Sequence, residues 1–227
     1  MQLILVTNQQ TRRTMLGPQS PYEVHAMRTS RNTALDQTIS ATTVNANSKI
    51  TTLPAPADAP ESVVTLLDGS EVTIRALRKE DAQLERDFIR NLSPESRWMR
   101  FLGQIGEPSD SLIRKLTDLD YQHEMAFIAL SREGGITHEV GVSRYSLASD
   151  RQSCECAVTV ADAWQGKGLG TILMRDLIDI ARKRGVRSMF SIDANENERM
   201  RELARDLGFK RERDPDDATR VIHRFVL

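Results

Sequence analysis

The sequence predicts an α/β fold of the α+β type, with a mixed and mostly antiparallel sheet. Apolar segments at 124–130, 140–147 and 153–160 follow one another along the chain, which is typical of an antiparallel meander. The third segment passes through a glycine-rich turn at 165–170 into an amphipathic pattern ending near 184. Helical patterns before the meander complete the mixture of helices and strands.

The composition limits the class of protein. The 227 residues have room for one domain and an appendage, and 39% hydrophobic with 28% charged residues is ordinary for a chain that buries a core. The formal net charge of −1 gives no support for a nucleic-acid partner or an acidic membrane surface.

The first sixty residues differ from the remainder. They are rich in Thr, Asn, Gln, Ser, Ala and Pro, show no sustained periodicity, and end in the proline-rich stretch 53–60. Such composition predicts a disordered N-terminal tail and linker at 1–60, followed by a folded domain at 61–227. A docking or regulatory arm is the alternative interpretation of the tail.

Targeting and metal signals are weak. The apolar start at 1–6 is too short for a signal peptide, and no apolar run could span a bilayer, so we expect a cytoplasmic protein. The two cysteines, Cys154 and Cys156, share one face of a predicted strand and are expected to be reduced. The four histidines show no metal-ligand spacing, so we expect no metal site.

The domain opens with a predicted hairpin, strands 63–67 and 72–75, with its turn at Asp68-Gly69. A helix through Leu84 and Ile89 follows. Ser93-Pro94 starts a second helix, which is expected to carry Trp98, Phe101 and Leu102 inward. Residues 109–119 form a third amphipathic stretch.

The C-terminal part continues the alternation. After the glycine turn and its helix, we predict a strand at 188–192, a helix at 197–207 that ends at Gly208, and a strand at 220–226. Asp162 is expected to pin the turn before the glycines, and Trp164 to pack beneath it.

The strand, glycine turn and helix at 153–184 predict an anion site. Free backbone N–H groups and the positive end of a helix dipole converge there, and glycine lets a phosphate approach the amides. A Walker loop and a G-x-G-x-x-G dinucleotide loop both fail on spacing. The pattern present is Q-x-x-G-x-G, at Gln165, Gly168 and Gly170.

This pattern resembles the acetyl-CoA pyrophosphate loop of the GNAT superfamily of N-acetyltransferases. Asn197, Met200, Leu203, Gly208 and Phe209 match its later N-x-x-(A/M)-x-x-L…G-F segment. The amino-acid sequences of segments 92–97 and 160–166 are similar to those in the acetyltransferase domain of bacterial protein lysine acetyltransferases. The resemblance covers 61–227 and implies a GNAT-like sheet with helices on both faces.

The resemblance also implies the chemistry. Glu155 is the candidate general base, because a mid-strand carboxylate is unfavourable unless it faces a cleft, and similar enzymes have a glutamate there. A solvated or arginine-paired glutamate is the alternative. Strand alternation points Glu155 away from both cysteines. The backbone N–H of Val160 would bind the thioester carbonyl oxygen.

The expected cofactor site uses main-chain groups. Amides of the glycine turn would hold the pyrophosphate, and Lys167 either adds a charge or is solvated; the turn comprises Gln165, Gly166, Lys167, Gly168, Leu169 and Gly170. Asn197 matches the pantetheine-side asparagine of the family, and a plain helix N-cap would also explain it. Many family members carry a tyrosine at the position of Ala204, and that tyrosine is proposed as the acid that protonates the leaving thiolate. The general acid of this chain is therefore unassigned.

The implied function is acetyl-CoA-dependent N-acetylation by direct attack of an amine, without a metal. The acceptor suggested by the resemblance is a lysine of a protein such as an acyl-CoA synthetase. Two alternatives remain: a small-molecule amine acetyltransferase, which an acid-lined pocket would favour over an open groove, and a non-catalytic acyl-CoA-binding regulatory module.

Overall fold

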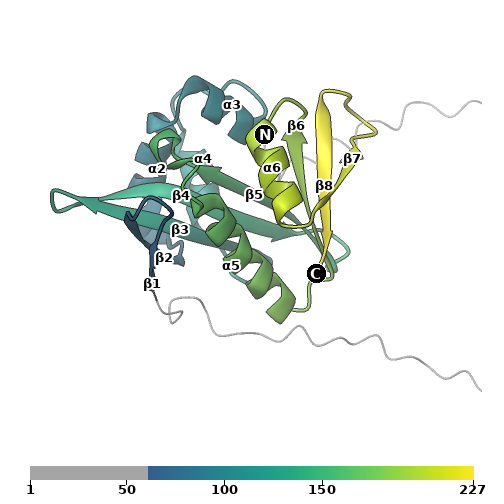
Figure 1. Cartoon of the computed structure of the whole chain (residues 1–227), viewed down its shortest axis with the longest axis horizontal. Coiled ribbons are helices and arrows are strands. Elements are labelled where there is room, and N and C mark those ends of the chain that lie inside the picture. The colour runs from purple at the N-terminus through teal and green to yellow at the C-terminus, as the bar shows by residue number, and fades with distance from the viewer. Residues whose placement is uncertain (1–60) are drawn as a thin grey trace, which may run out of the picture.

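The computed structural model describes residues 61–227, and the tail predicted for 1–60 lies outside the described residues. Eight strands form one sheet in the order β1-β2-β3-β4-β5-β6-β8-β7 (Figure 1). Their bounds are β1 Ser62–Thr65, β2 Glu71–Ala76, β3 Glu124–Glu133, β4 Ile136–Leu147, β5 Ser153–Val160, β6 Ser188–Ala194, β7 Lys210–Arg213 and β8 Arg220–Val226.

Five α-helices accompany the described sheet: α2 Ala82–Asn91, α3 Pro94–Phe101, α4 Asp110–Thr117, α5 Leu169–Lys183 and α6 Glu198–Asp206. Two short 3-10 helices, η3 Lys79–Asp81 and η4 Asp162–Trp164, precede α2 and the glycine turn. No described helix is long and apolar enough to cross a membrane.

Helices cover both faces of the sheet, as predicted, and each face has its own core. On one face, α5 packs with Cys154 and Cys156 of β5 and with Met189 of β6. On the other, Phe88 of α2, Phe101 of α3 and residues of α4 pack on Val142 of β4. Figure 1 shows α5 and α6 in front of the sheet and α2 and α4 behind it. Both faces therefore bury apolar side chains along alternating strand positions.

The sheet divides between β5 and β6. All neighbouring strands are antiparallel except this pair, which α5 connects as a parallel crossover. β5 pairs with β4 over seven residues, from Leu147↔Cys154 to Gly141↔Val160. It pairs with β6 over only three, ending at Glu155↔Phe190. Beyond Glu155 the two strands separate, and a wedge opens between them.

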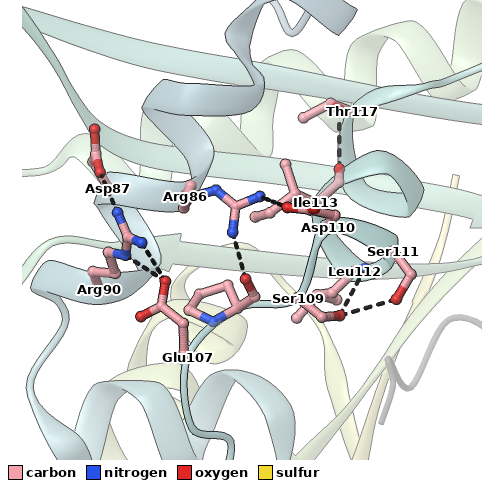
Figure 2. Close-up of polar contacts among 11 residues, drawn as sticks. Arg86, Asp87, Arg90, Glu107, Ser109, Asp110, Ser111, Leu112, Ile113 and Thr117 are labelled. Atoms are coloured by element: carbon pink, nitrogen blue, oxygen red, sulfur yellow. Dashed lines mark hydrogen bonds and ion pairs between the residues drawn. The ribbon is translucent and has the colours of Figure 1, made fainter.

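Arginines join α2 to the segment before α4 (Figure 2). Arg86 donates to the backbone oxygen of Pro108 and to Asp110, each at 2.5 Å. Arg90 binds Glu107 at 2.7 Å through Nε. Because these contacts are part-buried or exposed, each is expected to add little to the free energy of unfolding. Their structural role is to hold α2 against the start of α4.

The predicted fold class and most elements are confirmed, with three corrections. The hairpin turn is longer than the Asp68-Gly69 prediction, because β1 ends at Thr65 and Leu67 is 84% exposed. Leu102 does not continue α3 but caps it in the left-handed region, with φ +47°. The exposed charged strand β7, Lys210–Arg213, has no apolar alternation and was not predicted.

Candidate active site

A cleft of about 970 Å³ occupies the wedge between β5 and β6. Its walls include α3 on one side of the sheet, the glycine turn at the start of α5, and α6 on the other. Four of the predicted site residues line this cleft: Glu155, Val160 and Gln165, which are close in the sequence, and Asn197 at the start of α6. The missing strand pairing therefore creates one chamber that the glycine turn and Glu155 share.

The glycine turn presents free amides to this cleft. Gly166 and Gly168 have φ of +74° and +88°, in the left-handed region that favours glycine. Gly168 is the N-cap of α5, and no side chain caps the first turn. The N–H groups at the helix start therefore have no acceptor among residues 61–227. This arrangement fits a pyrophosphate, since the helix dipole and free donors point at the same space.

Two polar side chains fix the start of the turn. Gln165 donates from Nε2 to the Val160 carbonyl oxygen at 3.0 Å, while its buried Oε1 has no partner within the described residues. Asp162 accepts hydrogen bonds from the Ser93 amide and hydroxyl and from the Ser96 hydroxyl, at 2.7–2.9 Å. The predicted pinning role of Asp162 thus extends to the start of α3.

The Lys167 side chain points toward the β1–β2 turn. Its Nζ lies 2.9 Å from Asp68 and 4.8 Å from the centre of the Trp164 ring. The Leu67 amide also donates to the Lys167 carbonyl oxygen at 3.1 Å. The ammonium group is therefore engaged by the protein, and the turn would hold phosphate through its amides.

Asn197 serves as the N-cap of α6. Its side chain accepts from the Met200 amide at 3.0 Å, and the residue also faces the cleft. Ala204, seven residues further along α6, is 1% exposed and packs in the core that α6 shares with α5. The structure thus gives Asn197 a capping role and leaves a pantetheine contact as a prediction.

The Val160 amide faces the open wedge. The Ala161 amide donates to the Val140 carbonyl oxygen of β4 at 2.9 Å. Because successive N–H groups of a strand point to opposite edges, the Val160 N–H points toward β6, where β5 has no strand partner. An oxygen in the wedge could accept a hydrogen bond from it.

Glu155 is buried at the point where the strands separate. It is 9% exposed, and it has no hydrogen bond or ion pair within the part of the chain that the structure describes. Burial, and then the negative charge of Asp193, raise the pKa of its carboxyl from 4.5 to about 8. Within the described chain the side chain is thus neither solvated nor paired with an arginine, and its role as a general base stays a prediction.

Several charged residues of the cleft were not predicted. Glu155 apart, its acidic lining residues are Glu95, Asp162, Asp193, Glu196, Glu198, Glu202 and Asp206, and its basic ones are Arg100, Arg144 and Arg199. Except for Asp162, which was expected to pin the turn, their sequence positions carry no signal, because they lie in ordinary helix, strand or turn patterns and meet one another only in the folded chain. Within residues 61–227, no cluster of His, Cys, Asp and Glu could hold a metal ion.

Comparison with known proteins identifies the family. The sequence profile of the acetyltransferase (GNAT) family matches residues 95–209. A curated protein of Pseudomonas aeruginosa, Acetyltransferase PA5475, is 53% identical over 165 residues, which cover 73% of this chain and 89% of that protein. The chain belongs to the GNAT acetyltransferase family. Members of this family use acetyl-CoA as a co-substrate.

Solved structures confirm the fold. The GNAT domain of S. lividans PAT superposes with a TM-score of 0.67 at 24% identity, covering 74% of this chain and 97% of that domain. A cAMP-binding acyltransferase from Mycobacterium smegmatis gives a TM-score of 0.51 at 22% identity, over 73% of this chain and 47% of that protein. At these identities the similarity concerns the GNAT fold alone.

Proposed function

We propose that this GNAT acetyltransferase transfers the acetyl group of acetyl-CoA to a lysine ε-amine of a protein such as an acyl-CoA synthetase, with Glu155 as the general base. The observation that carries the proposal is a buried glutamate, without a cation partner in the described residues, at the opening between β5 and β6. Residues 61–227 would form the catalytic domain.

Glu155 has the protonation behaviour that the reaction needs. A lysine amine rests as an ammonium with a pKa of about 10.4, so it must lose a proton before it can attack. A carboxylate with a pKa near 8 is a better proton acceptor than an ordinary glutamate and is still ionised in a useful fraction of molecules near neutral pH. Glu155 would first take one proton from the ammonium, and the lone pair so freed would bond to the carbonyl carbon. The nitrogen would give its second proton to water as the carbon–sulfur bond breaks and the CoA thiolate leaves.

Val160 and the glycine turn would serve the other two requirements. The Val160 N–H would donate to the oxygen that becomes negative in the tetrahedral intermediate. The amides of Gly166, Gly168 and Gly170 would hold the pyrophosphate and thereby place the thioester near Glu155. Because a thiol has a pKa of about 8.5, the thiolate can leave without a dedicated acid, which accommodates Ala204.

The acidic cleft supports a cationic acceptor and keeps a second candidate open. Glu95, Glu196, Glu198, Glu202 and Asp206 are exposed around the cleft, whereas Glu155 and Asp193 lie deeper. An acidic rim attracts a lysine with basic neighbours, and it also suits a small polyamine. The second candidate is therefore acetylation of a small polycationic amine.

The deciding experiment measures binding and transfer separately. Calorimetric titration with acetyl-CoA and CoA tests the glycine-turn site. Intact-mass spectrometry after incubation with acetyl-CoA and an acyl-CoA synthetase tests transfer, and a gain of one acetyl group on the synthetase is the expected result. A parallel incubation replaces the synthetase by spermidine. Acetylation of spermidine but not of the synthetase would favour the small-amine candidate instead.

Glu155→Gln provides the control for both candidates, with Glu133→Gln, at an exposed position of β3 outside the cleft, as a matched variant. An enzyme loses turnover in the first and retains most of it in the second. A non-catalytic acyl-CoA-binding module would bind acetyl-CoA in all three proteins and acetylate nothing in any of them.

A further inference from the structure

Asp193 is a second carboxylate in the wall of the same cleft. It lies in β6, three residues beyond Phe190, where the pairing with β5 ends. Its side chain is 16% exposed and faces the cleft that Glu155 lines. By strand alternation Asp193 lies on the α5 face of β6, with Met189 and Ser191, whereas Glu155 lies on the face of its ladder partner Phe190. The two carboxylates thus reach one chamber from opposite faces of the sheet, through the opening between the separated strands.

Two buried residues fix the orientation of Asp193. Its Oδ2 accepts from the Ser191 hydroxyl at 2.6 Å and from the His223 ring at 2.9 Å. Ser191 and His223 are 1% and 2% exposed, and they face each other across the β6–β8 ladder. Because a carboxylate only accepts, the proton of this contact is on Nδ1 of His223. The Oδ1 of Asp193 has no hydrogen bond within 61–227.

The charge of Asp193 is not neutralised by an arginine or lysine. Its one ion-pair contact in the described chain is with His223, whose buried Nε2 has no partner there. A buried ring nitrogen without a partner is better tolerated as a bare acceptor than as an unpaired N–H. The arrangement therefore orients a negative charge beside the candidate base.

The other charged groups around Glu155 are directed elsewhere. Arg144 of β4, which faces Ala157 in the ladder, donates to the Leu116 carbonyl oxygen and approaches Glu85. Arg100 of α3 also binds Glu85. Arg224 of β8 stacks on Phe190 and pairs with Glu212. The remaining acid at this end of the cleft, Glu196, is exposed, and the Cys154 and Cys156 thiols face α5.

We propose that Asp193, oriented by His223 and Ser191, is a positioning residue of the transfer site that draws the ammonium form of the acceptor into the cleft and strengthens Glu155 as a proton acceptor. This inference rests on the proposed function of Glu155. A negative charge near Glu155 favours the cationic acceptor before proton transfer and favours the protonated carboxyl after it.

The test is the pH profile of kcat/KM for an amine acceptor in wild type, Asp193→Asn and Asp193→Glu. The asparagine keeps the shape and can still accept from Ser191 and His223, so we expect a folded protein with unchanged acetyl-CoA affinity. The acid limb should move to lower pH in Asp193→Asn by about one unit, as expected for loss of one nearby charge. Asp193→Glu should restore most of the original position, and Glu133→Gln, at an exposed position of β3 outside the cleft, should leave the limb unmoved.

A second measurement separates this inference from the proposed function. The carboxyl carbon of Glu155, assigned by comparison with Glu155→Gln, can be titrated by NMR in ¹³C-glutamate-labelled protein without any substrate. A lower titration midpoint in Asp193→Asn supports the inference even if no amine acceptor is acetylated. An unchanged midpoint and an unchanged acid limb, in a folded variant that binds acetyl-CoA, would overturn it.

Discussion

Glu85 and Glu155 are both buried glutamates near the cleft, and their surroundings differ in one respect. Glu85 of α2 is fully buried, with Arg100 bound to it and Arg144 at 3.7 Å. Glu155 is buried at the edge of the wedge with no cation partner in the described chain. The first carboxylate is compensated and the second is not.

The pKa shifts follow from this difference. Burial alone would raise the pKa of Glu85, but the charges of Arg100 and Arg144 outweigh it and lower the pKa. For Glu155, burial and Asp193 act in the same direction and raise the pKa to about 8. Burial by itself therefore does not mark a base. A buried carboxylate is available for proton transfer when the protein leaves its charge uncompensated.

The largest expected effect is on turnover. Glu155→Gln removes the base and should lower kcat by about 10²- to 10⁴-fold, the usual contribution of general base catalysis. Acetyl-CoA affinity should be retained and the melting temperature at pH 7 should not fall, because no described contact depends on the carboxylate. Steady-state kinetics with calorimetry measures both quantities. Wild-type turnover in this variant would remove Glu155 from the mechanism.

The opposite pattern is expected for Glu85→Gln. This change removes the carboxylate bound to Arg100 and leaves Glu139, the neighbouring buried carboxyl, to ionise in its place. The loss of unfolding free energy should therefore be at most about 3–5 kcal/mol, the cost of breaking a buried ion pair. Denaturant unfolding should show the loss, while the fraction that remains folded should keep its turnover. Glu133→Gln, at an exposed position of β3 outside the cleft, serves as the control for both measurements. A stable but inactive Glu85→Gln protein would contradict the distinction between the two glutamates.

The pH dependence of stability sharpens the comparison. Between pH 4.5 and about 8, folded Glu155 holds a proton that the unfolded chain has released. Its contribution to stability is therefore complete below pH 4.5 and is lost as the pH rises to about 8, at up to about 1.4 kcal/mol per pH unit. Melting temperatures of wild type minus Glu155→Gln, measured across this range, should fall with pH. A flat difference would mean that Glu155 titrates as an ordinary glutamate.

The smallest expected effect concerns the cofactor end of the cleft. Lys167 is paired with Asp68 in the hairpin turn, so Lys167→Met and Asp68→Asn should alter acetyl-CoA affinity similarly, by about threefold or less, as for an exposed ion pair. Calorimetry at two salt concentrations measures this. A much larger loss in Lys167→Met than in Asp68→Asn would instead make the ammonium group a direct phosphate ligand.

Local patterns predicted what local chemistry determines. The glycine turn, its helix and the Asn197 cap were predictable because each depends on neighbours within a few residues. Glu155 was identified as a candidate because a charge in the middle of an apolar strand is locally inconsistent. β7 was missed because its four residues are exposed and charged, and pairing with β8 alone makes it a strand.

The charge relationships of the site required the folded chain. Glu85 looks like one more polar residue of an amphipathic helix, and its partners Arg100 and Arg144 are distant in the sequence. Asp193 and His223 are separated by 30 residues and meet only through the β6–β8 ladder. No periodicity or motif reports which distant charges meet, so the compensated and uncompensated glutamates could not be distinguished beforehand.

The narrow junction between β5 and β6 also has a mechanical meaning. The β5–β6 ladder has three residue pairs and is shorter than the β4–β5 and β6–β8 ladders that flank it. The sheet therefore consists of two parts, β1–β5 and β6–β8, that few backbone hydrogen bonds connect. Under tension applied across the strands, this is the line along which the sheet would part first. Native-state hydrogen exchange would register the same weakness, with the amides of 158 and 160, beyond the last β6 pair, exchanging faster than their neighbours in the β4 ladder.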